Sequence, residues 1–175
     1  MKKFLSTLAI TACLFSSTVI ADESDHMSGG SIGYSSNTIN SESSTGGGYL
    51  NFDFLVPISS ASGFYYGAGV DANMMGTNVN GFGAGDSAYT MGATVKVGYS
   101  FNKNYNIPLQ LKAGLGYGVF DVGNFDSWGM QYETSADFTL FSNIGIGVKY
   151  KVANVEAAGR SFDIASTIGY ISFMK

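Results

Sequence analysis

The chain has few of the side chains on which catalysis and metal binding most often depend. Its 175 residues include one histidine, His26, and one cysteine, Cys13. Both lie near the N-terminus, so the rest of the chain offers no disulfide and no cysteine-based zinc site. Residues 67–72 match the dinucleotide pattern GxGxxA, but the helical pattern that this fingerprint requires does not follow them. We therefore expect no cofactor and no metal.

Charge and long apolar runs are also scarce. Charged residues make up 13% of the chain, the formal net charge is −4, and lysines and arginines do not cluster. Because phosphate binding needs clustered basic side chains, nucleic acid is excluded as a partner. Beyond the N-terminal segment, no stretch approaches the ~18 consecutive apolar residues of a membrane helix. If the chain spans a membrane it does so with strands, since only helices and closed barrels satisfy every backbone group in lipid.

The N-terminal segment has the pattern of a secretory signal. Lys2 and Lys3 precede a mostly apolar run over residues 4–20, and small residues end it at Ala21. We predict a signal peptide over residues 1–21, which are cleaved after export, and a polar leader over residues 22–29.

Two alternatives for this segment stay open. One is a retained membrane helix, although the run is short and rich in hydroxyl groups. The other is a lipid on Cys13, because residues 10–13 loosely resemble a bacterial lipoprotein box. The residues after Cys13 stay apolar up to Ala21, whereas lipoproteins usually turn polar there.

The rest of the sequence alternates large apolar residues with small or polar ones. In residues 89–101, Tyr89, Val95 and Phe101 share one face of a strand, and Thr90 and Lys96 share the other. Clear alternation also covers residues 50–56, 64–73, 109–119, 128–140 and 144–152. Two weaker strands, 31–38 and 162–174, complete an even set of eight. The predicted fold is all-β, an eight-stranded antiparallel transmembrane β-barrel formed by a single domain over residues 30–175.

The connections between these strands alternate in predicted length. The longer ones, rich in Gly, Asn, Ser and Asp, are residues 37–48, 74–88, 121–127 and 153–161. The shorter ones are residues 57–62, 102–107 and 141–143. Outer-membrane barrels have short turns at the periplasmic side and longer loops outside. Aromatic residues near the strand ends suit two interfacial girdles, with Phe54, Phe64, Tyr99, Phe101, Phe138 and Phe173 towards the short turns and Tyr89, Tyr117, Trp128 and Phe162 towards the loops.

The glycines favour a barrel whose apolar face is outside. Nine of them lie on the polar face of the strands: Gly67, Gly69, Gly92, Gly98, Gly114, Gly116, Gly118, Gly145 and Gly147. On a soluble carrier of the lipocalin type this face would be the outside, where glycine weakens a strand and gains nothing. In a narrow eight-stranded lumen, small residues make room for a few long ones. The carrier is therefore kept as the less favoured alternative.

Eight charged residues share that polar face and form the candidate functional site. They are Asp53, Asp71, Lys96, Lys112, Glu133, Asp137, Lys149 and Lys151. In a hairpin that turns at residues 141–143, paired positions sum to about 284, which places Glu133 opposite Lys151 and Asp137 diagonal to Lys149. Unpaired buried charges are costly, so we expect a network of ion pairs. Such a network is either a gate or ion path through the lumen or a seal that fills it.

Several segments resemble a known family. Residues 128–132 (WGMQY) and 137–150 (DFTLFSNIGIGVKY) resemble the sixth and seventh strands of OmpA/opacity-type outer-membrane β-barrels, and residues 111–117 (LKAGLGY) resemble the fifth. The resemblance implies residence in a Gram-negative outer membrane, contact with outer-membrane lipid, and insertion by the barrel assembly machinery. It also implies roles among small porins, surface antigens or adhesins, and structural proteins. Unlike the family's usual C-terminal aromatic residue, Phe173 is followed here by Met174 and Lys175.

The expected function is non-enzymatic. Outer-membrane barrel enzymes such as lipid A deacylases, phospholipases and omptin-type proteases use a histidine with a serine or carboxylate. Here His26 lies in the leader, with no strand to hold it near such a partner. We predict a structural or surface-exposed barrel whose loops could meet an extracellular partner. The alternative is a small porin-like channel with a charged lumen.

Overall fold

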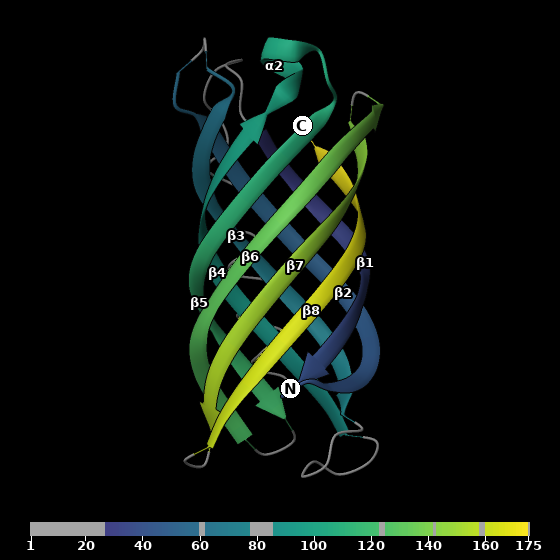
Figure 1. Cartoon of the computed structure of the whole chain (residues 1–175), viewed down its shortest axis with the longest axis vertical. Coiled ribbons are helices and arrows are strands. Elements are labelled where there is room, and N and C mark those ends of the chain that lie inside the picture. Colours follow the sequence, from purple (N-terminus) through teal and green to yellow (C-terminus); the bar gives the residue numbers. More distant parts are fainter. Residues whose placement is uncertain are drawn as a thin grey trace.

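The computed structural model describes residues 27–59, 62–77, 86–122, 125–141, 143–157 and 160–174. The strands are β1 (Met27–Ile39), β2 (Glu42–Pro57), β3 (Phe64–Thr77), β4 (Asp86–Ser100), β5 (Leu109–Val122), β6 (Phe125–Phe141), β7 (Ile144–Ala157) and β8 (Arg160–Met174). Each strand pairs antiparallel with the next, and β1 pairs with β8, so the sheet closes (Figure 1). The prediction of an eight-stranded antiparallel barrel is confirmed.

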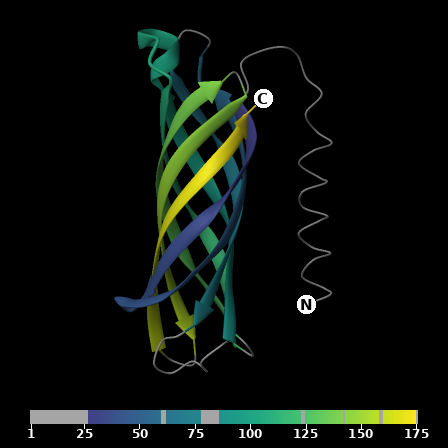
Figure 2. The same cartoon turned by 90° about the vertical axis from the view of Figure 1, so that its right-hand side faces the viewer.

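The barrel is tall and narrow, with strongly tilted strands (Figures 1 and 2). We call the end where β1 begins and β8 ends, at Met27 and Met174, the terminal end, and the opposite end the distal end. The connections β2–β3, β4–β5 and β6–β7 lie at the terminal end, as does the short helix α2 (Phe101–Tyr105). Among the described residues, no helix has the length and apolar character needed to cross a membrane.

Strand alternation places the apolar side chains outside. In β4, Val95 and Val97 are exposed by 68% and 59%. Thr94, which precedes Val95, and Lys96, which lies between the two valines, are buried. The same parity exposes Ile32, Tyr34, Leu50, Phe52, Phe64, Tyr66, Met74, Leu111, Leu115, Tyr117, Trp128, Met130, Tyr132, Phe138, Leu140, Ile146, Val148, Tyr150, Ile171 and Phe173. We call this surface the apolar band. A soluble carrier would turn this face inward. The structure therefore agrees with the prediction that the apolar face of the strands lies on the outside of the barrel.

The predicted distal loops were too long. Residues 37–48 belong mostly to β1 and β2, which meet in a two-residue turn at Asn40 and Ser41 with φ angles of 49° and 69°. Two consecutive positive φ angles match the right-handed twist of a hairpin, so the strands continue to the turn. Strands also extend into the three other predicted loops, reaching Thr77, Val122 and Ala157. Composition was misleading here because Ser, Asn and Gly are typical of loops. In a barrel with a polar lumen, the same residues can face inward from a strand and find hydrogen-bond partners there.

Three further expectations need correction. The strand predicted over residues 89–101 ends at Ser100, because Phe101 is the first residue of a helix. This helix, α2, occupies most of the turn that was predicted at residues 102–107. Asn106 ends this helix in the left-handed region (φ 53°), and its N–H donates to the carbonyl oxygen of Asn102. Phe162, which was assigned to an outer girdle, lies on the inward face and packs against buried residues of the lumen.

The N-terminal predictions lie mainly outside the described residues. The signal peptide over residues 1–21, Cys13 and His26 are all in that region. The polar leader was placed at residues 22–29, and β1 begins within it, at Met27.

Candidate functional site

All eight predicted charged residues lie in the lumen, where the side chains of six strands, β2 to β7, meet. They comprise four lysines and four carboxylates, so their formal charges cancel. The side chain of Lys112 is the most exposed among the ion-paired residues, at 12%, and that of Asp137 is fully buried. The site is therefore a compact, charge-balanced cluster enclosed by the barrel wall.

Lys96 of β4 lies at the centre of this cluster. Its Nζ atom is 2.5 Å from Asp53 Oδ1 on one side and 2.5 Å from Glu133 Oε1 on the other. Lys149 Nζ contacts the second oxygen of Glu133 at 3.1 Å. The side-chain oxygen of Asn51 accepts from both lysines at 3.3 Å. The two oxygens of Glu133 are thus matched to separate ammonium groups, which lowers the cost of burying the charges.

Lys112 connects the cluster to the terminal side of the lumen. Its Nζ atom lies 3.1 Å from Asp53 Oδ2 and 3.2 Å from Asp137 Oδ2. The other oxygen of Asp137 accepts a hydrogen bond of 2.8 Å from the hydroxyl of Tyr170. Asp53 is consequently shared by two lysines.

A separate ion pair lies towards the distal end. Lys151 Nζ donates to Asp71 Oδ2 at 2.6 Å, and the amide of Gln131 approaches the other oxygen of Asp71 at 3.5 Å. Beyond it, four neutral side chains form a hydrogen-bonded group, with donor–acceptor distances of 2.6–3.2 Å: Ser35, Asn37, Asn73 and Ser166.

The predicted backbone register is confirmed, but the predicted ion pairs are wrong. Glu133 is opposite Lys151 in the β6–β7 ladder, as the sum of 284 requires. Its carboxylate nevertheless contacts Lys149 and Lys96, while Lys151 contacts Asp71. Asp137 pairs with Lys112 rather than with Lys149. A lysine side chain is long enough to cross a narrow lumen, so its partner is set by barrel closure and not by its own hairpin.

Sequence reasoning missed the neutral residues that complete this lining. Tyr49 is almost fully buried, and Lys149 Nζ lies 5.2 Å from the centre of its ring, a cation–π distance. Tyr49 directly follows the predicted loop over residues 37–48, so it was not assigned to a strand. Asn51 and Gln131 were visible as members of the polar face, whereas Tyr170 was not assigned to either face of its strand. Their roles as hydrogen-bond partners depend on contacts across the barrel.

Glycines on the inward face make room for these long side chains. A Cβ atom added at Gly69 would overlap Asp53 and Lys96. One added at Gly147 would overlap the ring of Tyr170. Gly69 and Gly147 thus make room for side chains, whereas an added Cβ atom at Gly67 or Gly116 would meet the backbone of a neighbouring strand.

Replacing Gly147 with valine should lower the free energy of unfolding by about 1–3 kcal/mol, because the new side chain displaces Tyr170 from Asp137. The denaturation midpoint of the refolded barrel measures this effect. Gly169→Val is the matched control, since an added Cβ there meets nothing within 4 Å. Equal midpoints for the two variants would show that Gly147 does not make room for Tyr170.

Apolar residues close the lumen at the distal end. Ile39, Met75, Ala88, Phe120, Ala153, Val155 and Ile164 form one buried cluster, and Phe162 packs against it. We call this cluster the distal plug. It lies between the polar lumen and the distal turns, so a hydrated path through the whole barrel would have to cross a packed apolar layer.

Polar side chains also appear on the barrel exterior at the same level. The hydroxyl of Tyr132 donates to Asn154, the amide of Asn154 donates to Asp163, and the backbone N–H of Asp163 donates to Asn40 at 3.0 Å. Glu156 is also exposed there. The strands have 13 to 17 residues, whereas about 9–11 suffice to cross a bilayer. The distal part is therefore apolar inside, and its exterior combines these polar groups with the exposed side chains of Met74 and Trp128.

Metal ligands do not gather in the part of the chain that the structure describes: no group of three His, Cys, Asp or Glu residues there could hold a metal ion. The carboxylates of the lumen are matched to lysines instead. The arrangement can neutralise and fill the lumen.

No protein-family model matches the sequence, and no curated protein matches it either. Solved structures with the same fold include Ail, the attachment invasion locus protein of Yersinia pestis, with a TM-score of 0.57 and 11% identity over 86% of this chain and 99% of that one. Ail in complex with the heparin analogue sucrose octasulfate matches with a TM-score of 0.53, 13% identity, and coverage of 86% and 99%.

Neisserial surface protein A also shares the fold, with a TM-score of 0.56, 10% identity, and coverage of 85% of this chain and 96% of that one. At these identities the likeness concerns the fold. The chain has the fold of small eight-stranded outer-membrane barrels such as Ail, and most of its length takes part in it.

Proposed function

We propose that this protein is an integral, non-enzymatic barrel of a Gram-negative outer membrane, with its terminal end in the periplasm and its distal end at the cell surface. The observation that carries the proposal is the apolar band around a polar, charge-balanced lumen. Exposure of so many large apolar side chains is unfavourable in water and favourable against lipid. The chain reaches an outer membrane from the periplasm, and eight strands leave both of its ends on one side, so we place the terminal end in the periplasm.

The lumen supports a structural or surface role over a channel. Its ammonium and carboxylate groups are paired, and the distal plug covers them on one side. An eight-stranded barrel has an interior that side chains nearly fill. We propose that the ion pairs seal and stabilise the barrel, and that function resides in the distal part of the barrel, which projects from the membrane.

The partners we propose are outer-membrane lipid along the apolar band, the barrel assembly machinery during insertion, and an extracellular partner at the distal end. Ail is known in complex with a polyanion, the heparin analogue. In this chain the described distal exterior instead exposes the carboxylates of Glu42, Glu156 and Asp163. Like charges repel, so the chemistry of the distal end favours a neutral or cationic partner.

The refolded chain from residue 22 onwards should be electrically silent in a planar bilayer. A heat-modifiable gel shift first establishes that the barrel has formed in detergent. Folded barrels without current steps support a sealed lumen. Discrete steps that change on Lys112→Glu would contradict the seal and establish the charge-lined channel. A chain that is soluble without detergent and shows no gel shift would contradict membrane residence altogether.

A further inference from the structure

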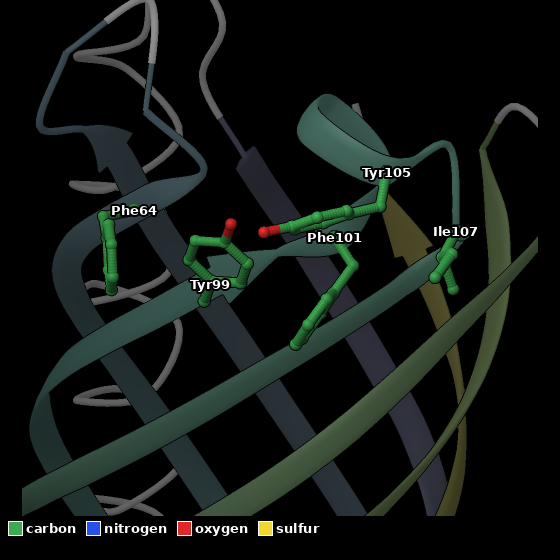
Figure 3. Close-up of a pocket in the computed structure, with 5 residues that line it drawn as sticks. All are labelled: Phe64, Tyr99, Phe101, Tyr105 and Ile107. Carbon is green, nitrogen blue, oxygen red and sulfur yellow. The ribbon is translucent and has the colours of Figure 1, made fainter.

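An open groove lies on the outside of the barrel at its terminal end. It is lined by Phe64 at the start of β3, Tyr99 at the end of β4, Phe101 and Tyr105 of α2, and Ile107 after the helix (Figure 3). It is shallow and open on one side, with a volume of roughly 480 Å³. We call it the aromatic notch.

Ring contacts hold the walls of the notch in place. Phe64 and Phe101 both meet Tyr99 edge to face, with ring centres 4.7 and 4.8 Å apart. The side-chain amide of Asn104 donates to the Tyr99 hydroxyl at 3.0 Å. Tyr105 extends from α2 above Phe101, with its hydroxyl directed towards Tyr99 (Figure 3). An occupant would therefore meet a pre-arranged apolar wall and would not have to order it.

The notch is continuous with the apolar band. Tyr66 and Val97, the next outward residues below Phe64 and Tyr99, are exposed by 53% and 59%. Above it, α2 is amphipathic, because Phe101 and Tyr105 line the notch while Asn102 is exposed. A change from aromatic to polar surface within one helical turn is typical of the membrane–water interface.

We propose that the aromatic notch binds one acyl chain of a phospholipid from the periplasmic leaflet, whose ester and headgroup region lies beside α2. This inference rests on the membrane residence and orientation proposed above. Left empty, the notch would expose Phe64, Tyr105 and Ile107 to interfacial water, each being about half exposed or more. An acyl chain covers these surfaces and needs no hydrogen bond from them, whereas a polar occupant would find few partners.

Tryptophan quenching by brominated lipid tests the proposal. The chain has a single tryptophan, Trp128, so Trp128→Phe gives a dark background into which Phe64→Trp introduces a reporter in the notch. The folded protein in detergent is titrated with a phospholipid brominated on its acyl chains. Quenching should saturate at a lipid concentration roughly fivefold lower than for Phe173→Trp, because the walled site adds contacts that a flat surface lacks.

Phe173 is a matched control because it also lies on the outward face at the terminal end, with an exposure of 50% against 54% for Phe64. Changing Tyr105 and Ile107 to serine in the Phe64→Trp protein removes the α2 side of the notch and leaves every strand intact. Its curve should then match the Phe173→Trp curve. Identical curves for the two reporters, or an unchanged curve in the serine variant, would overturn the proposal.

A brominated detergent that quenches Phe64→Trp at equally low concentration would also overturn it, since any apolar tail would then suffice. A heat-modifiable gel shift for each variant separates this inference from the proposed function. Folded barrels with equal quenching reject only the lipid site, whereas chains that show no barrel reject membrane residence.

Discussion

Asp53→Ala should lower the free energy of unfolding of the barrel by about 3–5 kcal/mol. Asp53 is the carboxylate that both Lys96 and Lys112 share, at 2.5 and 3.1 Å. Its removal leaves the four luminal lysines facing three carboxylates in an enclosed space. Breaking a buried ion pair costs more than the pair contributes, because the remaining charge stays desolvated.

Unfolding in urea, followed by Trp128 fluorescence of the barrel in phospholipid vesicles, measures this loss. Glu42→Ala is the control, because this carboxylate is exposed at the distal turn, where substitutions usually change stability by less than about 0.5 kcal/mol. Replacing Lys112 with methionine in the Asp53→Ala protein should restore part of the loss, since the charges again balance. Equal midpoints for Asp53→Ala and Glu42→Ala would mean that the luminal ion pairs do not stabilise the fold.

The strands and their faces could be predicted because each depends on a local pattern. Alternation in residues 89–101 identified the outward Val95 and the inward Lys96 without knowledge of any neighbouring strand. The β6–β7 register followed from the position of one turn. These features need only the two-residue period of a strand and the length of a hairpin connection.

Partners across the lumen could not be predicted in the same way. Lys151 reaches Asp71, which is 80 positions away and on a strand that does not neighbour its own. That contact depends on closure of β1 against β8 and on the tilt of the strands, which local alternation does not contain. The extent of β1 and β2 was missed for a related reason. Inward Ser35 and Asn37 have loop-like side chains, and their hydrogen bonds reach Asn73 on β3.

The position of the membrane along the barrel leads to the second large expected effect. Val95 is exposed by 68% near the middle of β4 and pairs with Ala68 and Leu115, which also face outward. An arginine at the lipid-facing midplane costs about 2–4 kcal/mol, and the cost falls to about 0–1 near the interfaces. Val95→Arg should therefore lower the free energy of unfolding of the inserted barrel by about 2–4 kcal/mol, the cost at the midplane. Glu156 also lies on the outer face, but near the distal end of β7.

Glu156→Arg should accordingly change the stability by no more than about 1 kcal/mol, because its side chain would remain in water. Both variants are inserted into vesicles and exposed to a series of urea concentrations. The fraction of heat-modifiable barrel that remains at each concentration is then compared between them. The distal plug explains why this contrast is expected within a single continuous sheet. Around Ile39 and Ile164 the apolar side chains point inward, so this segment needs no lipid outside to cover them. An equally large loss for Glu156→Arg would place the whole strand length in the bilayer and contradict a projecting distal part.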